Sequence, residues 1–588
     1  MLTKLEEKIQ GSFEKEELEF ITEKVDDVVL LIAYLEKMDL RKIMDKYIPF
    51  HWKQRELSWG WTAVIWLAYI LSEGDHRKVK MEIYVRGAMN TLRKATGQPI
   101  NPLDFSDDRL SHLLSHLSKA NVWEEIEREL AENSIEVFEL PAATVRCDAS
   151  TISGYHVSEV EGLMQFGHSK DNGNLPQIKI MSGALDPLGM PLITEVVSGE
   201  KADDILYIPV IEKIRNILKK DGLLFVSDCK GSALKIRSCI VEHGNRYLSP
   251  LPLTGNTAKE MEAWITDGIK KRTDGCLEFV YKENAKGEKV LVAEGYELER
   301  IITVPQDNGV KEWTERVFVI KSPAYGKQQE KGLEKRLKNA QEKINKLTPP
   351  RGKGRRQITE EKALLEGIER IIEVQKVEGL LEVKYEKEIE IEEKYKGKGR
   401  GSAKRKKRKK EKVRYQITGV HKNEIKIEQA KERFGWKAFV TSACKEEMSL
   451  SEAILCYRKE YRVERIFNRL KSRLKISPLY VKNDDQIIGL TNLLILGTTA
   501  STLLEFVVRR SLEKDKAGLP DLHPENKIKK TNKPTAERIL KAFSGIYLNI
   551  IKTPGGNDII KLTALSELQK EILQRSGLDE NVYLQLET

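Results

Sequence analysis

Apolar residues recur every three to four positions through the first quarter of the chain. The segments VVLLIAYLEKM, WTAVIWLAYIL and LSHLLSHLSKA show this spacing most clearly, and it is the spacing of one buried helix face. Ser106, followed by Asp107 and Asp108, has the composition of a helix N-cap with acids in the first turn. The pattern predicts an all-helical unit over residues 1–140.

At Ala143 the pattern changes to the short apolar runs typical of strands. ATVRCD is followed by QIKIMSGAL and MPLITEVVS, which are joined by a turn at residues 186–189. A helical stretch, ILYIPVIEKIRNILKK, and another apolar run, GLLFVSD, come next. Strand, hairpin, helix, strand is the order of an RNase H-like fold, an α/β fold whose mixed sheet is flanked by helices. The first part of this core is predicted over 141–252.

Residues 253–435 predict a β-rich insertion domain that interrupts the core. EFVYKENAKGEKVLVAEGY alternates as a hairpin does, and a charged helix from about Lys327 to Leu347 ends before Pro349 and Pro350. A second helix to Val374 would complete a helical hairpin. The alternating runs LEVKYEKEIEI and VRYQITGV flank a basic loop, 397–412, which we expect at the tip of a β-hairpin.

The second part of the core is predicted over 436–515, and residues 516–588 predict a helical C-terminal tail after a polar linker. The apolar run from Ile487 to Val508 reaches the length of a bilayer span. It also contains Glu505, several threonines and two glycines, Gly489 and Gly497. A buried core helix is therefore favoured over a membrane helix.

Composition limits what the charge can mean. A chain of 588 residues with 40% hydrophobic residues suggests a folded protein of several units. Its formal net charge is +10, but residues 397–412 hold ten basic residues and one acid and so account for nine of those ten charges. Overall basicity therefore does not indicate DNA binding. The basic loop is equally typical of a solvated loop and of a nonspecific phosphate-binding arm.

The six cysteines form no C-x-x-C pair, and the N-terminal residues MLTKLEEKIQ lack the apolar core of a signal peptide. We expect a reducing, cytoplasmic setting. Cys147 and Cys229 stand beside the two aspartates discussed next, and we interpret both as small buried residues.

Two aspartates and one glutamate are the candidates for chemistry. Asp148 and Asp228 each follow an apolar strand, and in the RNase H-like order these strands are parallel neighbours. Glu464 stands seven residues after Tyr457 and seven before Lys471. Seven residues make almost two turns of α-helix, so these three side chains are expected on one face.

Taken singly, these acids are weak signals, because an aspartate after a strand is usually a turn or capping residue. Together they predict a site for two Mg²⁺ ions, which take hard oxygen ligands and promote phosphoryl transfer. We assign Asp148 as the bridging ligand, Asp228 to one ion and Glu464 to the other. Mn²⁺ is expected to substitute.

The chain resembles insertion-sequence transposases of the DDE class, in the IS-four superfamily. The signature helix of that family reads Tyr, two residues, Arg, three residues, Glu, six residues, Lys, and Tyr457, Glu464 and Lys471 match it. DASTISGY, TPPRGKGRRQ and DFSDDRL resemble other family segments, so the resemblance covers nearly the whole chain. Gly231 lies three places after Asp228, where relatives often have a glycine two places after.

Glu460 occupies the signature arginine position, which is the main departure from the family pattern. We expect Arg458, Arg462 or Arg465 to make the missing phosphate contact, and an impaired copy is the alternative. A further alternative is that Glu460 itself is the ligand, although the spacing to Tyr457 and Lys471 favours Glu464.

The resemblance implies a bacterial, nucleoid-associated DNA transposase that binds terminal inverted repeats and acts as a homodimer on transposon ends and target DNA. It implies cut-and-paste transposition by strand nicking, hairpin formation and strand transfer, with Tyr457 and Lys471 on the DNA. Trp436 is a candidate for base stacking, with a core residue as the alternative. The rival functions are a Mg-dependent structure-selective nuclease and an inactive, DNA-binding transposase descendant.

Overall fold

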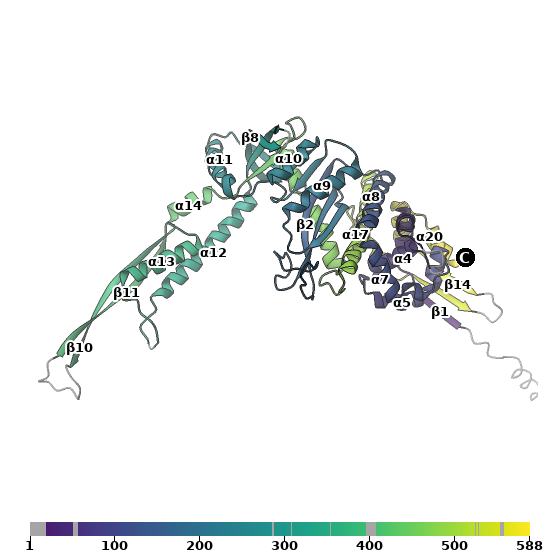
Figure 1. The fold of residues 1–588 in the computed structure, drawn as a ribbon, viewed down its shortest axis with the longest axis horizontal. Coiled ribbons are helices and arrows are strands. Elements are labelled where there is room, and N and C mark those ends of the chain that lie inside the picture. The colour runs from purple at the N-terminus through teal and green to yellow at the C-terminus, as the bar shows by residue number, and fades with distance from the viewer. Residues whose placement is uncertain are drawn as a thin grey trace, which may run out of the picture. The chain divides into compact units, whose positions relative to one another are not determined.

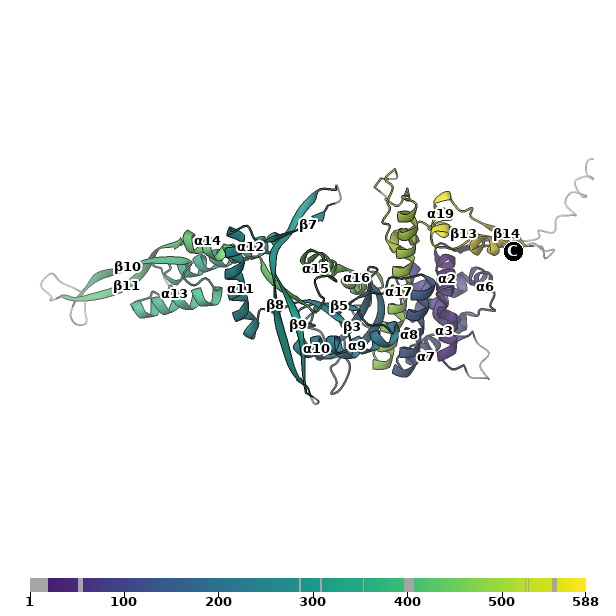
Figure 2. The ribbon, with the colours of Figure 1, turned by 90° about the horizontal axis from the view of Figure 1, so that it is seen from above.

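The computed structural model describes residues 19–50, 57–284, 287–306, 309–352, 354–395, 407–523, 525–526, 528–552 and 558–588. The chain divides into two compact units. The first comprises the residues up to Ser249 with Val304–Lys311 and Tyr457–Thr588, and the second comprises Pro250–Thr303 and Glu312–Cys456. Their helices and strands are drawn in Figures 1 and 2.

The predicted N-terminal helices are confirmed. They are α2 (Val28–Lys37), α3 (Leu40–Tyr47), α4 (Trp59–Glu73), α5 (Lys78–Gly87), α6 (Met89–Thr96), α7 (Asp107–Leu117) and α8 (Ala120–Val137). The Ser106 side chain caps α7 by accepting a hydrogen bond from the Arg109 N–H at 3.4 Å. Burial of the apolar positions of α2, α4 and α7 explains their spacing in the sequence.

The prediction of an all-helical N-terminal unit and a helical tail is wrong in one respect. Strand β1 (Glu19–Lys24) pairs antiparallel with β13 (Tyr547–Lys552), which pairs with β14 (Ile559–Leu562). The helices α18 (Ala536–Lys541), α19 (Glu567–Arg575) and α20 (Asn581–Leu584) complete the C-terminal region. Strands of four to six residues carry too little periodicity to be recognised, and pairing across opposite ends of the chain is decided by tertiary contacts.

Five strands of a large mixed sheet form the centre of the first unit. They are β2 (Thr144–Ser153), β3 (Gln177–Asp186), β4 (Met190–Ser198), β5 (Leu224–Ser227) and β6 (Arg246–Pro250), in the order β4-β3-β2-β5-β6. The β3–β4 hairpin is antiparallel to β2, whereas β5 is parallel to β2 and to β6. Helices α9 (Asp204–Leu218) and α10 (Leu234–Glu242) flank the sheet. The predicted parallel pairing of the two aspartate-bearing strands is thus confirmed.

The long apolar helix is α17 (Asp484–Lys514), and it is a core helix as predicted. Among the described residues it is the one helix long and apolar enough to cross a membrane, but its apolar window is 94% buried inside the protein. It packs closely on α7, where a Cβ added at Gly489 would lie 2.0 Å from the Leu114 carbonyl oxygen. Gly489 therefore permits the close approach of the two helices.

The second unit contains strands β7 (Glu278–Glu283), β8 (Lys289–Gln306), β9 (Gly309–Lys321) and β12 (Trp436–Thr441), in the order β12-β9-β8-β7, with helix α11 (Gly255–Thr273). The predicted helical hairpin is α12 (Pro323–Leu347) and α13 (Glu361–Gln375), and the flanking strands β10 (Leu381–Tyr395) and β11 (Lys407–Lys422) pair antiparallel before α14 (Glu424–Glu432). Most of the basic loop, 396–406, lies outside the described residues.

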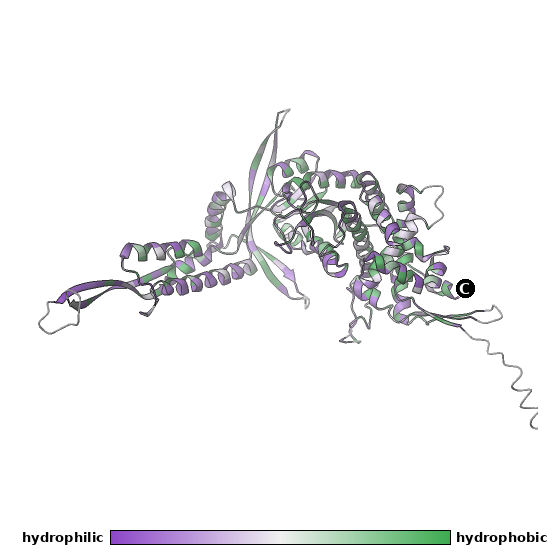
Figure 3. Ribbon diagram, turned by 60° about the horizontal axis from the view of Figure 1, so that its bottom comes forward, coloured by the Kyte–Doolittle hydropathy of each residue, from purple (hydrophilic) through white to green (hydrophobic). Residues whose placement is uncertain are grey.

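We call residues 323–434 the arm. Its helices and hairpin share a hydrophobic core of their own, formed by Leu333, Leu337, Ala340, Ile344, Leu364, Ile368, Val377, Leu381, Tyr415, Ile417 and Ile427. The far end of its hairpin is predominantly hydrophilic (Figure 3). The Ser322 N–H donates to the Gly435 carbonyl oxygen at 2.8 Å, so the arm leaves the second unit and returns to it at one point.

Candidate active site at strands β2 and β5

The two predicted aspartates lie side by side in the sheet of the first unit. Cys147 and Ser227 are register partners in the parallel β2–β5 pair. Asp228 follows the last residue of β5 as predicted, whereas Asp148 lies within β2, which continues to Ser153 because its pairing with β3 extends that far. Parallel strands bring equivalent positions to the same end of the sheet. Two carboxylates remote in sequence therefore meet at one edge.

Asp148 is a partly buried acid with basic and acidic neighbours. Its Oδ1 accepts a hydrogen bond from the Ala149 N–H at 2.8 Å and lies 3.6 Å from Lys170 Nζ. Burial raises the pKa of Asp148 to about 6, the charge of Lys170 opposes this shift, and the charges of Asp228 and Glu464 add to it. Desolvation and like charges both disfavour the ionised form. No sequence pattern pointed to Lys170, which stands in an irregular loop.

Asp228 is held by the turn that follows β5. Its Oδ1 accepts hydrogen bonds from the Tyr207 hydroxyl at 2.8 Å and from the N–H groups of Lys230 and Gly231 at 2.9 and 3.4 Å. A Cβ added at Gly231 would lie 2.2 Å from Ser227 Oγ. Gly231 thus lets the turn fold tightly around the Asp228 carboxylate. This close packing is the local structural reason for a glycine three places after Asp228.

The predicted single helix from Tyr457 to Lys471 is wrong. Helix α15 (Leu450–Tyr457) ends at Tyr457, a turn follows, α16 (Tyr461–Asn468) begins at Tyr461, and residues Arg469–Arg473 form a π-helix. The Glu460 N–H bonds to the Tyr457 carbonyl oxygen, three residues back. Seven-residue spacing places side chains on one face only in a continuous α-helix, so tertiary contacts rather than heptad geometry place these residues.

One set of those contacts ties α16 to the β3–β4 hairpin. Arg462 Nη1 lies 2.5 Å from Asp186 Oδ1, and Arg146 donates to the other carboxylate oxygen at 3.2 Å. Although burial favours the neutral acid, the two arginines hold the pKa of Asp186 below its ordinary value. Gly189 has φ +73°, and a Cβ there would lie 2.5 Å from the Arg462 carbonyl oxygen. The hairpin turn and α16 are therefore in direct backbone contact.

A second set ties α16 and the π-helix to α17 through Glu505. This 4% exposed carboxylate accepts from Arg465 at 2.6 and 2.8 Å, from Arg469, and lies 2.7 Å from Arg509 Nη1. Arg469 also donates to Thr502 Oγ1 at 2.6 Å. One buried acid thus anchors the segment that carries Glu464 and Lys471.

Two glutamates of this segment approach the aspartates. Glu464 is exposed, and its charge contributes to the raised pKa of Asp148. Burial raises the pKa of Glu460 to about 7, a hydrogen bond with Tyr457 opposes the shift, and the charges of Asp148 and Asp228 add to it. Glu460 therefore lies in the field of both aspartates. Glu464 and Glu460 are therefore both chemically able to serve as the third acidic ligand.

Lys471 lies beside β2. Its Nζ donates to Ser150 Oγ and to Asp171 Oδ1, both at 2.8 Å. Ser150 is two residues after Asp148, so the ammonium group is part of the same site. Ser150 belongs to the segment DASTISGY singled out in the sequence, whereas no sequence pattern pointed to Asp171.

The remaining predicted DNA contacts lie in different surroundings. Arg458 is exposed. Arg462 and Arg465 form the ion pairs with Asp186 and Glu505. Trp436 is 2% exposed, and its ring lies against Gly268, where an added Cβ would be 2.5 Å away. Trp436 is therefore a core residue, which was the alternative to base stacking, and its burial leaves no ring face open to a base.

The donor set suits divalent cations, although it is not a closed cage. Within the described ranges, no three His, Cys, Asp or Glu side chains are arranged to hold a metal ion as they stand. Every hydrogen bond that the two aspartates accept from described residues ends on Oδ1. The Oδ2 atoms of Asp148 and Asp228 are hard oxygen donors that remain for Mg²⁺, an ion that keeps several waters and needs few protein ligands.

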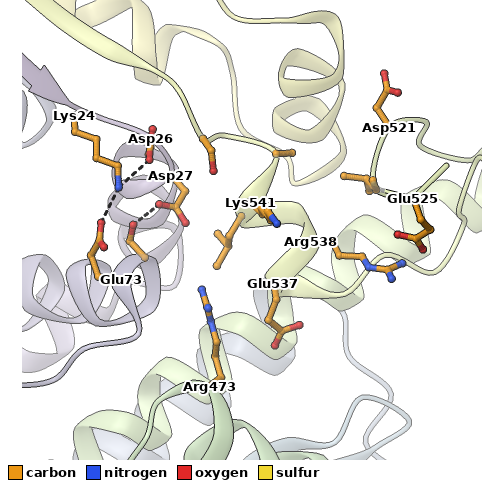
Figure 4. Close-up of a pocket in the computed structure, with 15 residues that line it drawn as sticks. Lys24, Asp26, Asp27, Glu73, Arg473, Asp521, Glu525, Glu537, Arg538 and Lys541 are labelled. Atoms are coloured by element: carbon orange, nitrogen blue, oxygen red, sulfur yellow. Dashed lines mark hydrogen bonds and ion pairs between the residues drawn. The ribbon is translucent and has the colours of Figure 1, made fainter. Parts of the chain in front are cut away.

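A separate cavity of about 760 Å³ lies elsewhere in the first unit. Figure 4 shows Lys24, Asp26, Asp27 and Glu73 at one side and Arg473, Glu537 and Arg538 at the other. Burial raises the pKa of Asp27 to about 6, and a hydrogen bond from Ser72 opposes this shift. None of the described residues that line it is a predicted catalytic or DNA-binding residue.

No protein-family model matches the chain, and no curated protein matches it. Among solved structures, the chain is similar to a piggyBac transposase in a synaptic complex with hairpin DNA. The two share 8% identity with a TM-score of 0.30, over 88% of this chain and 80% of that chain. A TM-score this low carries no weight for fold or function.

Proposed function

We propose that this protein is a DNA transposase with an RNase H-like catalytic core, which cuts and joins DNA by metal-dependent phosphoryl transfer. The observation that carries the proposal is the adjacency of Asp148 and Asp228 on parallel strands, with two glutamates and Lys471 beside them. Burial raises the pKa of Asp148 and of Glu460, and a carboxylate cluster with such members is more typical of metal-dependent chemistry than of structural capping.

In this proposal Asp148, Asp228 and Glu464 would hold two Mg²⁺ ions, with Asp148 shared between the ions, Asp228 on one and Glu464 on the other. Bound there, the ions would supply the Lewis acidity that activates a water or 3′-hydroxyl and stabilises the leaving oxygen. Lys471 would meet a phosphate oxygen, and Tyr457 and Arg458 would contact the DNA backbone. Ionised Asp148 is required, so its raised pKa predicts a loss of activity in acid.

The proposed reaction sequence is nicking at the end of a mobile element, hairpin formation and strand transfer, performed by a homodimer on paired ends. The first test uses full-length protein and DNA from either side of its gene, with Mg²⁺ or Mn²⁺. We expect nicked, hairpin and joined products that disappear in Asp148→Asn and Glu464→Gln.

Two other results would support the rival functions. Cleavage without joining to target DNA would favour a structure-selective nuclease. DNA binding without cleavage in either metal would favour an inactive transposase descendant. Glu460 at the signature arginine position is the sequence feature that fits this rival function.

A further inference from the structure

The arm contains a cleft whose lining is built for phosphate. The cleft has a volume of about 540 Å³ and lies between the loop after α12 and strand β11. Four basic and two acidic residues line it together with a glutamine, a threonine and a valine: Arg351, Lys410, Lys412, Arg414, Glu390, Glu411, Gln357, Thr359 and Val413.

The loop covers only part of the outer edge of β11. The Tyr415 N–H donates to the Ile358 carbonyl oxygen at 3.0 Å, and the Ile417 N–H donates to Thr348 Oγ1 at 3.1 Å. N–H groups two residues apart on a strand face the same edge. The N–H groups of Val413 and Glu411 therefore face the cleft, and no described residue accepts a hydrogen bond from them.

The basic side chains of the cleft are held in place by acids of β10. Arg351 bonds to Glu390 and lies 3.5 Å from Glu388, and Lys412 lies 2.7 Å from Glu392. The side chains of Arg351 and Lys412 are 47% and 53% exposed. Ion pairs at this exposure contribute little to stability, so a phosphate can share or replace the carboxylate partner, and a guanidinium retains further donors for it.

The row of bases continues along β11 beyond the cleft. Lys407, Arg408 and Lys409 are exposed and directly precede Lys410 of the cleft, which suits a linear polyanion better than a single small ion. Strand-edge N–H groups and basic side chains recognise the backbone without reading bases.

From these contacts we infer that the cleft between strand β11 and the loop residues Arg351, Gln357 and Thr359 is a binding site for the phosphate backbone of double-stranded DNA. The inference rests on the proposed function for its choice of DNA as the polyanion. It assigns to the arm a sequence-independent grip, separate from the site that holds Asp148 and Asp228.

The test compares two full-length triple variants that each remove three positive charges from the arm. The cleft variant is Arg351→Gln, Lys410→Gln and Lys412→Gln. The matched control is Lys335→Gln, Lys338→Gln and Lys343→Gln, at exposed positions of α12 outside the cleft. Circular dichroism and thermal unfolding establish that both variants are folded.

Binding of a labelled duplex of mixed sequence is measured by fluorescence anisotropy between about 50 and 200 mM NaCl. We expect the cleft variant to bind about tenfold or more weakly at low salt and to reduce the slope of log Kd against log salt by about 2 to 3, because each lost phosphate contact removes about 0.9. The control should lose much less. Equal losses in both triples, or none in either, would overturn the inference.

Two further measurements distinguish the possible outcomes. Inorganic phosphate competing at low millimolar concentration would indicate a small-anion site, and tighter binding of duplex RNA would indicate a different polymer. Either result contradicts the inference. If the wild-type protein binds DNA through the cleft but never cleaves it, the proposed function is refuted and the inference about the cleft is retained. Cleavage by a cleft variant that binds like the wild type would refute the cleft alone.

Discussion

At the scale of single residues, the main energetic feature of the site is the cost of keeping the Asp148 carboxylate partly buried beside other acids. Asp148 is surrounded by the charges of Asp228 and Glu464 and by the ammonium group of Lys170. Glu460 adds another acid in the same field. A site that assembles like charges destabilises the folded protein, and it becomes favourable only through the ligands that those charges bind.

Replacing Asp148 by asparagine should stabilise the protein at neutral and alkaline pH. The pKa of Asp148 is 3.8 in the unfolded reference and about 6 when folded. As pH rises through that window, the unfolded chain loses the proton first, so wild-type stability falls and stays lower above pH 6. Asp148→Asn should therefore be more stable at pH 8 by about 1 to 3 kcal/mol and should lose this advantage near pH 4.

Urea unfolding at pH 4, 6 and 8 measures the difference. Asp267→Asn, at an exposed position of α11, is the control and should show no gain that grows with pH. An Asp148→Asn protein that parallels the wild type at every pH would mean that the carboxylate ionises as an ordinary surface acid.

The choice between Glu460 and Glu464 is also made at this scale. If Glu464 is the ligand, Glu464→Gln removes cleavage, whereas Glu460→Gln retains it and moves the acid limb of the pH profile to lower pH, because one negative charge near Asp148 and Asp228 is gone. The cleavage rate from pH 5 to 8 in Mn²⁺ measures both variants. The reverse pattern, with cleavage lost in Glu460→Gln and kept in Glu464→Gln, would assign the metal to Glu460.

At the scale of elements, the segment from α15 to the π-helix is positioned by ion pairs with neighbouring elements. Asp186 holds Arg462 at the hairpin side, and Glu505 holds Arg465 and Arg469 at the α17 side. These contacts fix a helix that is interrupted at both ends. Because this helix is irregular at both ends, its backbone hydrogen bonds alone do not define its orientation, and side-chain ion pairs are needed to fix it.

Replacing Glu505 by glutamine should destabilise the protein by about 3 to 5 kcal/mol, because three arginines lose a buried counter-charge. Hydrogen exchange should rise most in residues 461–473, with little change in α9 beyond the global loss. Glu513→Gln, exposed on the same helix, is the matched control. Uniformly raised exchange in both regions would show that Glu505 stabilises the unit as a whole without specifically positioning α16.

At the scale of the whole molecule, the arm is a module inserted at a single point. It has its own hydrophobic core, and its two ends meet in the hydrogen bond between Ser322 and Gly435. Strands β9 and β12, which lie on either side of the insertion point, pair directly from Lys321 and Trp436 onward. The insertion therefore does not interrupt their register.

Excision of residues 323–434, with a short glycine link from Ser322 to Gly435, should leave a folded protein. Its thermal midpoint should fall by only a few degrees, since the deleted core is separate. Metal-dependent cleavage should survive at low salt, with weaker DNA binding. Differential scanning calorimetry and the cleavage assay measure these effects. A shortened chain that fails to fold would contradict the modular description; a second excision that retains Gly326, which packs near Gly435, tests whether the junction alone is responsible.

The sequence by itself determined the elements whose periodicity is long and regular. The N-terminal helices, the aspartate-bearing strands, the proline-separated helical pair of the arm and the buried character of α17 follow from apolar spacing, turn residues and composition. Asp148 and Asp228 could be predicted as neighbours because strand order constrains which strand ends meet.

Only the tertiary structure decided the features that depend on contacts between distant residues. The break at Tyr457–Tyr461, the π-helix, the burial of Trp436, the β1–β13 pairing and the position of Glu460 near both aspartates depend on partners such as Asp186 and Glu505. Local propensity differences are below about 1 kcal/mol per residue for most residues, whereas leaving a buried charge without its partner costs about 3 to 5 kcal/mol, so the long-range contacts override the local pattern.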